Sequence, residues 1–315
     1  KIWNGYLKET DVINTFNGDF GYRPDRFFLS SVVNIGDEPA QWLTNAPDTR
    51  YALATDYGVA SLMSFPNNGV SLGKMKLTYT EDDGQITSET VDNVYNKGGM
   101  GAYISNSDWN ILHFGCYPAN IYNWSSTFKA LVDNKTLASY TVQGQTSAGV
   151  NITYPFTVNI LCPNQKGYEP IRLTWLNQWG TWDYYTFNMK SSKSISTKGS
   201  TYQQLGGTWN ESTYKPNSYK GGKKSFRVNA TEKIIMNTDF VNESESEWFE
   251  ELINSPEIYI LNGFKTDSPG SALTTYVIPV RLQTSSYTRK TVANDKLMQY
   301  TFEVEKSKTL RTQAV

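Results

Sequence analysis

The segment from Trp175 to Ser191 constrains the fold of this chain more than any other part of the sequence. Six aromatic side chains fall within its first 13 residues, around one glycine, one asparagine and one aspartate. The segment holds no histidine, no cysteine and no glycine-rich phosphate loop, which are common components of catalytic sites. Aromatic side chains favour strands and form rigid contact surfaces. The segment therefore indicates β structure that serves binding or assembly rather than catalysis.

The flanking residues place this segment on a β-hairpin. Strand-like runs at 171–175 and 183–187 surround the turn-forming residues Asn177 to Gly180. Glycine readily supplies the positive φ that many tight turns require, so Gly180 is expected at the turn. We single out the aromatic side chains and the enclosed carboxylate as candidate binding or assembly residues. They are Trp175, Trp179, Trp182, Asp183 and Tyr184.

Strand patterns recur along the chain and predict an all-β fold built from β-sandwich-type domains. Residues 74–80 alternate apolar and polar side chains and then meet an Asp-Gly turn, as a half-buried strand would. Further strand-like runs occur at 27–35, 151–161, 225–229, 232–237, 257–261, 274–283 and 298–305. The turn-rich sequence from Cys162 to Pro170 predicts a boundary between an N-terminal β domain, residues 1–162, and a C-terminal β domain, residues 163–315.

The C-terminal domain is predicted to contain one short helix and two irregular segments. The helix spans about 243–254, because Asn242 is a good N-cap, Glu245 completes a capping box and a proline follows the last turn. Residues 191–224 are rich in serine, glycine, lysine and tyrosine and are predicted to form a long loop. Residues 306–315 are predicted to form an extended tail.

Charge and hydropathy argue against two classes of partner. The net charge is −1, whereas nucleic-acid-binding proteins usually carry a basic excess. No run of the sequence approaches the ~18 apolar residues that a membrane-spanning helix needs. We therefore expect neither a nucleic-acid partner nor insertion into a membrane.

The sequence offers little for catalysis, a metal or a cofactor, and none is predicted. His113 is the only histidine and lies in an apolar run, where a core role is favoured over a thiol site with Cys116. Cys116 and Cys162 are expected to be buried thiols, with one disulfide as an open alternative. The acidic turn at 81–84 lacks the spacing of a calcium-binding loop. Asp183 is the first candidate for a glycosidase carboxylate, although a role in fixing the turn is favoured.

Two blocks of opposite charge are the remaining candidates for assembly. The basic block lies in or next to the predicted loop and comprises Lys215, Lys220, Lys223, Lys224 and Arg227. The acidic block lies on the predicted helix and includes Glu247 and Glu251. Opposite charges on one chain can meet across neighbouring subunits. A solvated loop is an equally good alternative.

Four segments of the C-terminal half resemble structural proteins of tailed bacteriophages, many known from marine or Bacteroidetes-infecting phage genomes. The segments are Arg172 to Phe187, Glu250 to Ile260, Tyr276 to Val280 and Lys296 to Glu305. Their order and spacing match that group, and the resemblance covers roughly residues 115 to 312. It implies a virion protein of the tail, baseplate or neck, and it brings no catalytic residues with it.

The resemblance and the composition together predict a non-enzymatic virion subunit. Such a subunit would fold in the host cytoplasm, form a homo-oligomeric ring and contact other virion proteins. The first alternative is a carbohydrate- or receptor-binding protein whose aromatic platform contacts a host-surface glycan, and the second is a glycoside hydrolase. Burial of the aromatic side chains distinguishes the virion subunit from the carbohydrate-binding protein. Aromatic side chains buried in a core favour assembly, whereas an open aromatic groove favours sugar binding.

Overall fold

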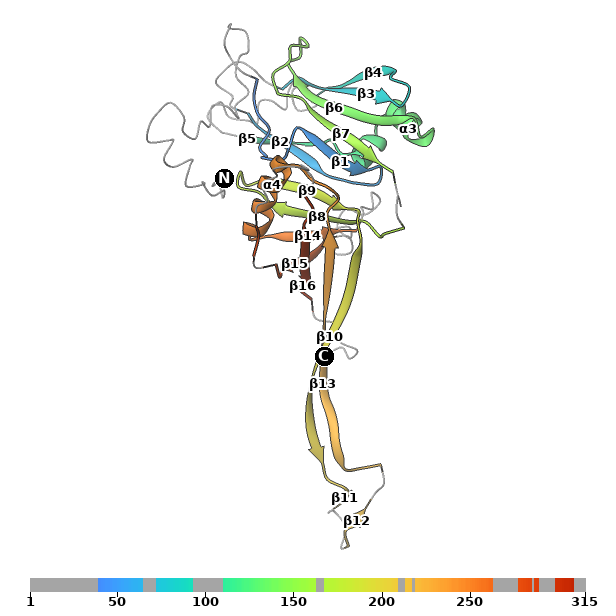
Figure 1. Ribbon diagram of the computed structural model, residues 1–315, viewed down its shortest axis with the longest axis vertical. Coiled ribbons are helices and arrows are strands. Elements are labelled where there is room, and N and C mark those ends of the chain that lie inside the picture. Colours follow the sequence, from blue (N-terminus) through green and yellow to red (C-terminus); the bar gives the residue numbers. More distant parts are fainter. Residues whose placement is uncertain are drawn as a thin grey trace, which may run out of the picture.

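The computed structural model describes residues 39–64, 72–92, 110–162, 167–208, 213–216, 219–262, 277–284, 286–288 and 298–308. Within these residues the chain is mostly β-strand with three helices, which confirms the predicted all-β class. Two large sheets lie one above the other, and a long two-stranded ribbon projects from the lower one (Figure 1). The predicted strand at 27–35 lies outside the described residues.

The first sheet is built from strands that precede residue 162. Its order is β1-β7-β6-β3-β4, with β1 parallel to β7 and the other neighbours antiparallel. The strands are β1 (Thr49–Leu53), β3 (Lys74–Glu81), β4 (Ile86–Asp92), β6 (Leu137–Gln145) and β7 (Phe156–Leu161). A separate pair consists of β2 (Val59–Ser64) and β5 (Asn110–Gly115). The predicted alternation along β3 is confirmed, because every second side chain is buried.

Two short helices pack against this first sheet and contribute to its hydrophobic core, so the prediction of a single helix is wrong. They are α2 (Pro118–Tyr122) and α3 (Ser126–Asp133). Pro118 begins α2, and the side chain of Ser125 caps α3 by accepting a hydrogen bond from the backbone N–H of Phe128 (2.9 Å). The ring of Phe128 lies 5.4 Å from the rings of both Tyr79 and Tyr140. This contact anchors α3 on the sheet.

The second sheet is built from strands that follow residue 170, in the order β10-β13-β16-β15-β14-β8-β9. All its neighbouring strands are antiparallel. The strands are β8 (Ile171–Leu176), β9 (Trp182–Phe187), β10 (Ser191–Gln204), β13 (Gly222–Asn237), β14 (Ile258–Leu261), β15 (Val277–Leu282) and β16 (Thr301–Lys306). The two sheets thus divide near the predicted boundary at 162, while the independence of two domains stays a prediction.

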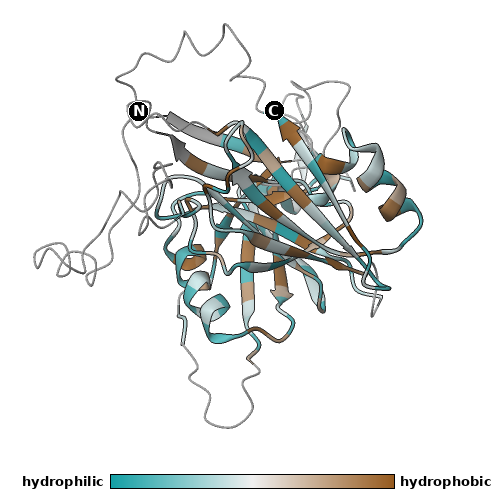
Figure 2. Ribbon diagram, turned by 90° about the horizontal axis from the view of Figure 1, so that it is seen from above, coloured by the Kyte–Doolittle hydropathy of each residue, from teal (hydrophilic) through white to brown (hydrophobic). Residues whose placement is uncertain are grey.

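Helix α4 (Glu243–Asn254) covers one face of the second sheet, and its predicted position is confirmed. The predicted capping box is also present: Asn242 Oδ1 accepts from the N–H of Glu245, whose carboxylate accepts from the N–H of Asn242. Phe249 of α4 packs against aromatic rings of the sheet, namely Tyr185, Phe187 and Phe302. Hydrophobic positions alternate with hydrophilic ones along the strands (Figure 2), as expected for sheets with differently covered faces.

The predicted loop at 191–224 is wrong, because most of this segment belongs to a β-ribbon. Strands β10 and β13 pair from Ser191↔Met236 to Gln204↔Gly222. Only residues 233–237 of β13 also pair with β16, so the ribbon leaves the sheet beyond them. We call residues 195–231 the arm; near its tip lies a small pair formed by β11 (Gly207–Thr208) and β12 (Lys215–Pro216). The arm projects away from the body as a separate structure (Figure 1).

The predicted C-terminal tail is described only in part. Strand β16 ends at Lys306, whose Nζ lies 2.8 Å from the carboxylate of Glu232. Residues 309–315, which make up most of the predicted tail, lie outside the described residues.

Candidate functional site

The predicted hairpin is confirmed, and its two faces have different surroundings. Strands β8 and β9 pair along their whole length, and Gly180 in the turn has a φ of 73°. Successive side chains of a strand point to opposite faces. One set of β9 side chains faces helix α4 and comprises Asp183, Tyr185 and Phe187. The other set lines a cavity and comprises Trp182, Tyr184 and Thr186.

The hairpin face toward α4 is part of the core. Trp175 is fully buried, with its ring 4.8 Å from that of Trp248. The buried carboxylate of Asp183 accepts hydrogen bonds from Thr44 Oγ1 (2.6 Å), Asn177 Nδ2 (3.1 Å) and the indole N–H of Trp248 (2.7 Å). Burial raises the pKa of Asp183, while the hydrogen bonds from Thr44 and Trp248 oppose that shift. Asp183 therefore fastens the hairpin to its surroundings and is not part of the cavity lining.

The turn of the hairpin is fastened to the segment at residues 43–45. Asn177 Oδ1 accepts from the backbone N–H groups of Trp179 and Thr181, both at 3.0 Å, and its Nδ2 donates to the carbonyl of Leu43 (2.9 Å). The indole N–H of Trp179 donates to Asn45 Oδ1 (3.0 Å). Trp179 is 8% exposed, so it serves a contact within the chain and not an open aromatic platform.

We expect Trp179→Ala to lower the free energy of unfolding by roughly 2–4 kcal/mol, since it leaves a hole at the turn and removes the hydrogen bond to Asn45. Trp182→Ala should cost clearly less, because the Trp182 side chain is only partly buried. Urea unfolding followed by circular dichroism measures both. If both variants lowered the free energy of unfolding equally, the assignment of Trp179 to the buried turn and of Trp182 to the cavity would be contradicted.

A cavity of about 890 Å³ lies beside the outer face of the hairpin. Strands β8, β9 and β14 supply one wall, where Thr174 stands between its cross-strand neighbours Tyr184 and Tyr259. The opposite wall includes the segment from Leu53 to Val59, which joins β1 to β2. The cavity therefore lies between the two halves of the chain.

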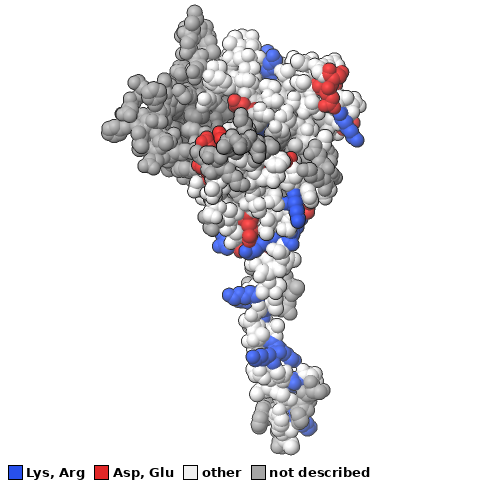
Figure 3. All heavy atoms as spheres, in the orientation of Figure 1, with Lys and Arg blue, Asp and Glu red and all other residues white. Residues whose placement is uncertain are grey.

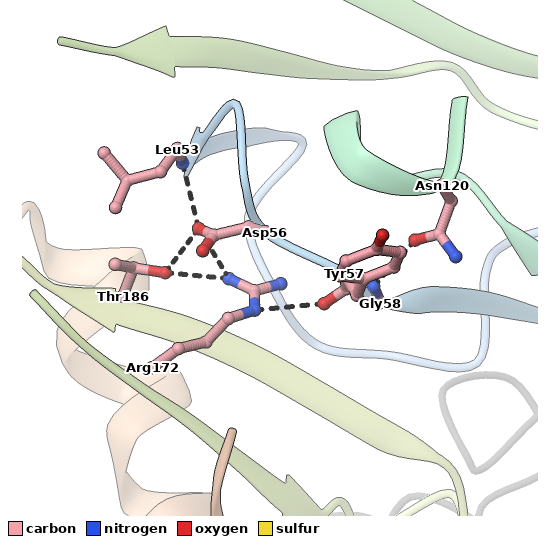
Figure 4. Close-up of polar contacts among 7 residues, drawn as sticks. All are labelled: Leu53, Asp56, Tyr57, Gly58, Asn120, Arg172 and Thr186. Carbon is pink, nitrogen blue, oxygen red and sulfur yellow. Dashed lines mark hydrogen bonds and ion pairs between the residues drawn. The ribbon is translucent and has the colours of Figure 1, made fainter. Parts of the chain in front are cut away.

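Arg172 of β8 is the central polar group of this cavity (Figure 4). Its Nε donates to the carbonyl of Tyr57 (3.0 Å), and its Nη1 donates to Asp56 Oδ2 (3.1 Å) and Thr186 Oγ1 (2.8 Å). The hydroxyl of Thr186 in turn donates to Asp56 Oδ2 (2.7 Å), which also accepts from the backbone N–H of Leu53 (2.9 Å). The side chains of Arg172 and Asp56 are only 5% and 7% exposed, so this ion pair is buried.

The guanidinium of Arg172 also contacts two aromatic rings, Tyr117 and Tyr184, which pack against each other with centroids 5.3 Å apart. Its carbon lies 4.6 Å from the ring centroid of Tyr117 and 5.1 Å from that of Tyr184, within cation–π range. A Cβ at Gly58 would lie 2.6 Å from the Tyr117 ring and 3.2 Å from Arg172 Nη2, so glycine leaves room for this arrangement. Nη2 nevertheless has no hydrogen-bond partner in the described structure, and neither has the buried hydroxyl of Thr174.

The site residues that were predicted from the sequence lie in three different places in the structure. Trp182 and Tyr184 line the cavity, whereas Trp175, Trp179 and Asp183 are buried. The basic block lies on the arm and comprises Lys215, Lys220, Lys223, Lys224 and Arg227. It is therefore not brought together with the aromatic hairpin.

The acidic block is divided as well. Glu247 is exposed on α4, but Glu251 is 1% exposed and accepts a hydrogen bond from Asn45 Nδ2. Glu251 thus contributes to the contact between α4 and the N-terminal half and does not share an exposed surface with Glu247.

Sequence reasoning missed most of the cavity, including Arg172, Asp56, Asn120 and Tyr259. One signal was present in the sequence: Arg172 lies between apolar residues in a strand pattern. An arginine buried in such a position needs a partner.

The remaining candidate residues show no catalytic arrangement. His113 is exposed rather than in the core, and its Nδ1 lies 2.8 Å from Ser61 Oγ. Cys116 and Cys162 are both free thiols, so the disulfide alternative is wrong. Burial raises the pKa of Cys116 to about 12, which keeps it a thiol, whereas Cys162 is exposed against expectation.

Comparison with protein-family models, curated proteins and solved structures finds no match to this chain. None of the helices among the described residues is long and apolar enough to cross a membrane. Within the same residues, no three histidine, cysteine, aspartate or glutamate side chains are grouped so that they could hold a metal ion. The arm and the cavity are the two features that bear most directly on function.

Proposed function

We propose that this protein is a non-enzymatic structural subunit of a tailed-phage virion, located in the tail, baseplate or neck, and that copies of it assemble through the arm. The arm is the observation that carries the proposal. Ten of the 14 residues of β10 lie in the arm, and ten strand residues span ~33 Å at ~3.3 Å per residue. The resemblance of the C-terminal half to phage structural proteins supports the particular setting.

The arm has only two long strands and, among its described residues, no packed hydrophobic face, so it would be only marginally stable by itself in water. The open edges of such strands also invite pairing with another chain. Phe226 is 73% exposed and Ile195 is 64% exposed, so large apolar side chains face solvent along the arm. A partner that covers them would stabilise the ribbon.

The exposed apolar side chains gather on one face over part of the arm. Directly opposite residues of an antiparallel pair share a face. The pairs Gly199↔Val228 and Thr197↔Ala230 therefore lie on the same face as Ile195. The alternate pairs Ser200↔Arg227 and Lys198↔Asn229 are polar and basic. Over residues 195–199 and 228–230 the arm thus presents one less polar face, with Ile195, Val228 and Ala230, and one polar face.

Charge favours a second copy of the chain as that partner. The arm carries six basic residues and one acidic residue, whereas the rest of the sequence carries 23 basic and 29 acidic residues. In Figure 3 the arm shows basic side chains, while the acidic side chains visible on this face lie on the body. A basic arm and an acidic body attract each other between copies but cannot both be satisfied within one extended subunit. Repetition of such a head-to-tail contact generates a ring or a filament.

The test replaces residues 197–230 by an Asn-Gly turn, which joins the cross-strand neighbours Ser196 and Thr231 without changing the register. Light scattering should show a multimer for the full chain and a monomer for the shortened one, and circular dichroism should show that the shortened chain is still folded. Negative-stain electron microscopy should show rings for the full chain only.

Two point variants sharpen this test. Ile195→Ser with Val228→Ser changes the apolar face and should also give a monomer. Ser196→Ala with Asn229→Ala changes the opposite face of the arm and should leave the multimer intact. A full chain that is monomeric, or a multimer that survives removal of the arm, would contradict the proposal.

A further inference from the structure

We infer that the cavity beside the aromatic hairpin binds a neutral saccharide unit. This inference concerns a second site and does not rest on the arm. The cavity volume of about 890 Å³ lies within the ~300–1,000 Å³ that is usual for small-molecule sites. It lies on the hairpin face away from α4, so an occupant would not disturb the second core.

Aromatic rings in the cavity wall suit the apolar face of a sugar ring. Trp182 and Tyr259 are partly exposed, and their ring centroids lie 5.7 Å apart in an edge-to-face arrangement. Tyr184 lies two residues after Trp182 on β9, so its side chain is on the same face of the strand, and it also lines the cavity. Carbon-bound hydrogens on one face of a pyranose carry a small positive charge and pack against such rings, whose faces are electron-rich.

Unpartnered polar groups in the same wall call for hydrogen-bond acceptors. Arg172 and Thr174 are 5% and 6% exposed, and Arg172 Nη2 and Thr174 Oγ1 have no partner among the described residues. Asn120 uses its Oδ1 to accept from the N–H of Gly58 (2.9 Å), which leaves its amide N–H₂ as a further donor. Arg172 Nη2 and Thr174 Oγ1 are closed to solvent, so an oxygen atom of an occupant reaches them only after neighbouring side chains shift. A buried donor without an acceptor costs ~1–3 kcal/mol, which favours that contact once the side chains have shifted.

The charge of the cavity decides between a neutral and an anionic occupant. The positive charge of Arg172 is already matched by Asp56, whose Oδ2 lies 3.1 Å from Nη1. An added carboxylate or phosphate would meet that buried aspartate as a like charge. Hydroxyl oxygens can accept from the amide N–H₂ of Asn120 without this repulsion. The combination of aromatic rings, free donors and a neutralised charge therefore favours a neutral, hydroxyl-rich ring over an acidic sugar or phosphate.

Saturation-transfer NMR on the full chain tests this inference, with neutral monosaccharides and short oligosaccharides as probes. Glucuronate and inorganic phosphate serve as the anionic comparison. We expect transfer to at least one neutral sugar, and a loss in affinity of about tenfold or more for Trp182→Ala and for Tyr259→Ala. Trp124→Ala, at an exposed tryptophan outside the cavity, should leave the affinity unchanged.

Three outcomes would overturn the inference. They are no transfer to any neutral sugar, transfer that survives both cavity variants, and binding of the anions alone. The shortened-arm variant should retain sugar binding, and Trp182→Ala should retain the multimer. These two measurements separate a failure of the saccharide site from a failure of the proposed assembly.

Discussion

Replacement of Arg172 by alanine should lower the free energy of unfolding by ~3–5 kcal/mol, the range for breaking a buried ion pair by removing one partner. Asp56 would keep its hydrogen bonds from Leu53 and Thr186 but would be left buried without its cation beside an empty space. The Tyr117 and Tyr184 rings would also lose their contact with the guanidinium. Urea unfolding at neutral pH measures the loss.

An exposed ion pair of the same chain provides the control for this prediction. Lys193 lies 2.7 Å from Glu169, but the two side chains are 43% and 65% exposed. Solvent screens such a pair, so Lys193→Ala should cost only ~0–1 kcal/mol. If Arg172→Ala lowered the free energy of unfolding no more than Lys193→Ala, the buried Arg172–Asp56 pair would not be a main source of stability.

A double-mutant cycle separates the ion pair from the packing of the side chains. Arg172→Met keeps much of the volume, and Asp56→Asn removes the charge while an amide oxygen can still accept from Leu53. The double variant should be more stable than Arg172→Met alone, because no unpaired charge then stays buried. A double variant less stable than either single one would place the main contribution in packing.

The hairpin and α4 could be predicted from the sequence because their signals are local. Gly180 marks the turn between two strand patterns, and Asn242 with Glu245 marks the start of the helix. The strand at 74–80 was visible for the same reason, since one half-buried face gives strict alternation. In each case the residues that determine the element lie within about one element length of one another.

The arm could not be predicted in this way, because its composition is that of a loop. Strand β10 is rich in serine and threonine and is exposed along nearly all of its length. Its strand conformation comes from pairing with β13, whose partner residues lie between 18 and 45 positions further along the chain. The short helices were hidden for the opposite reason: α2 and α3 lie in aromatic sequence typical of strands, although Pro118 and Ser125 mark their starts.

The division of the aromatic hairpin into core and cavity was equally invisible. Trp175 and Trp182 are the same residue type in neighbouring strands, and what separates them is the tertiary neighbour that covers each face. Arg172 and Asp56 lie 116 positions apart, so no local pattern connects them. The sequence indicated that the hairpin is a contact surface, and the structure determines which side chains contact what.

Trp175→Ala should lower the free energy of unfolding by ~3–5 kcal/mol, because it empties the space beside Trp248 in the second core. Trp175→Phe should lower the free energy of unfolding much less than the reduction in side-chain volume alone would predict. The indole N–H of Trp175 is buried and has no acceptor among the described residues. Phenylalanine lacks that donor, so the ~1–3 kcal/mol cost of burying an unpaired N–H disappears. This gain offsets part of the free energy lost with the packing of the larger ring.

Urea unfolding of both Trp175 variants beside Trp124→Ala measures these effects on one scale. Trp124 is 42% exposed, so its replacement should change stability by no more than ~0.5 kcal/mol. Trp175→Phe should lie much closer to this control than to Trp175→Ala. A phenylalanine variant as unstable as the alanine variant would mean that the indole N–H does have an acceptor in solution. Such an acceptor, most simply a bound water, would make Trp175 a polar contact of the core as well as an apolar one.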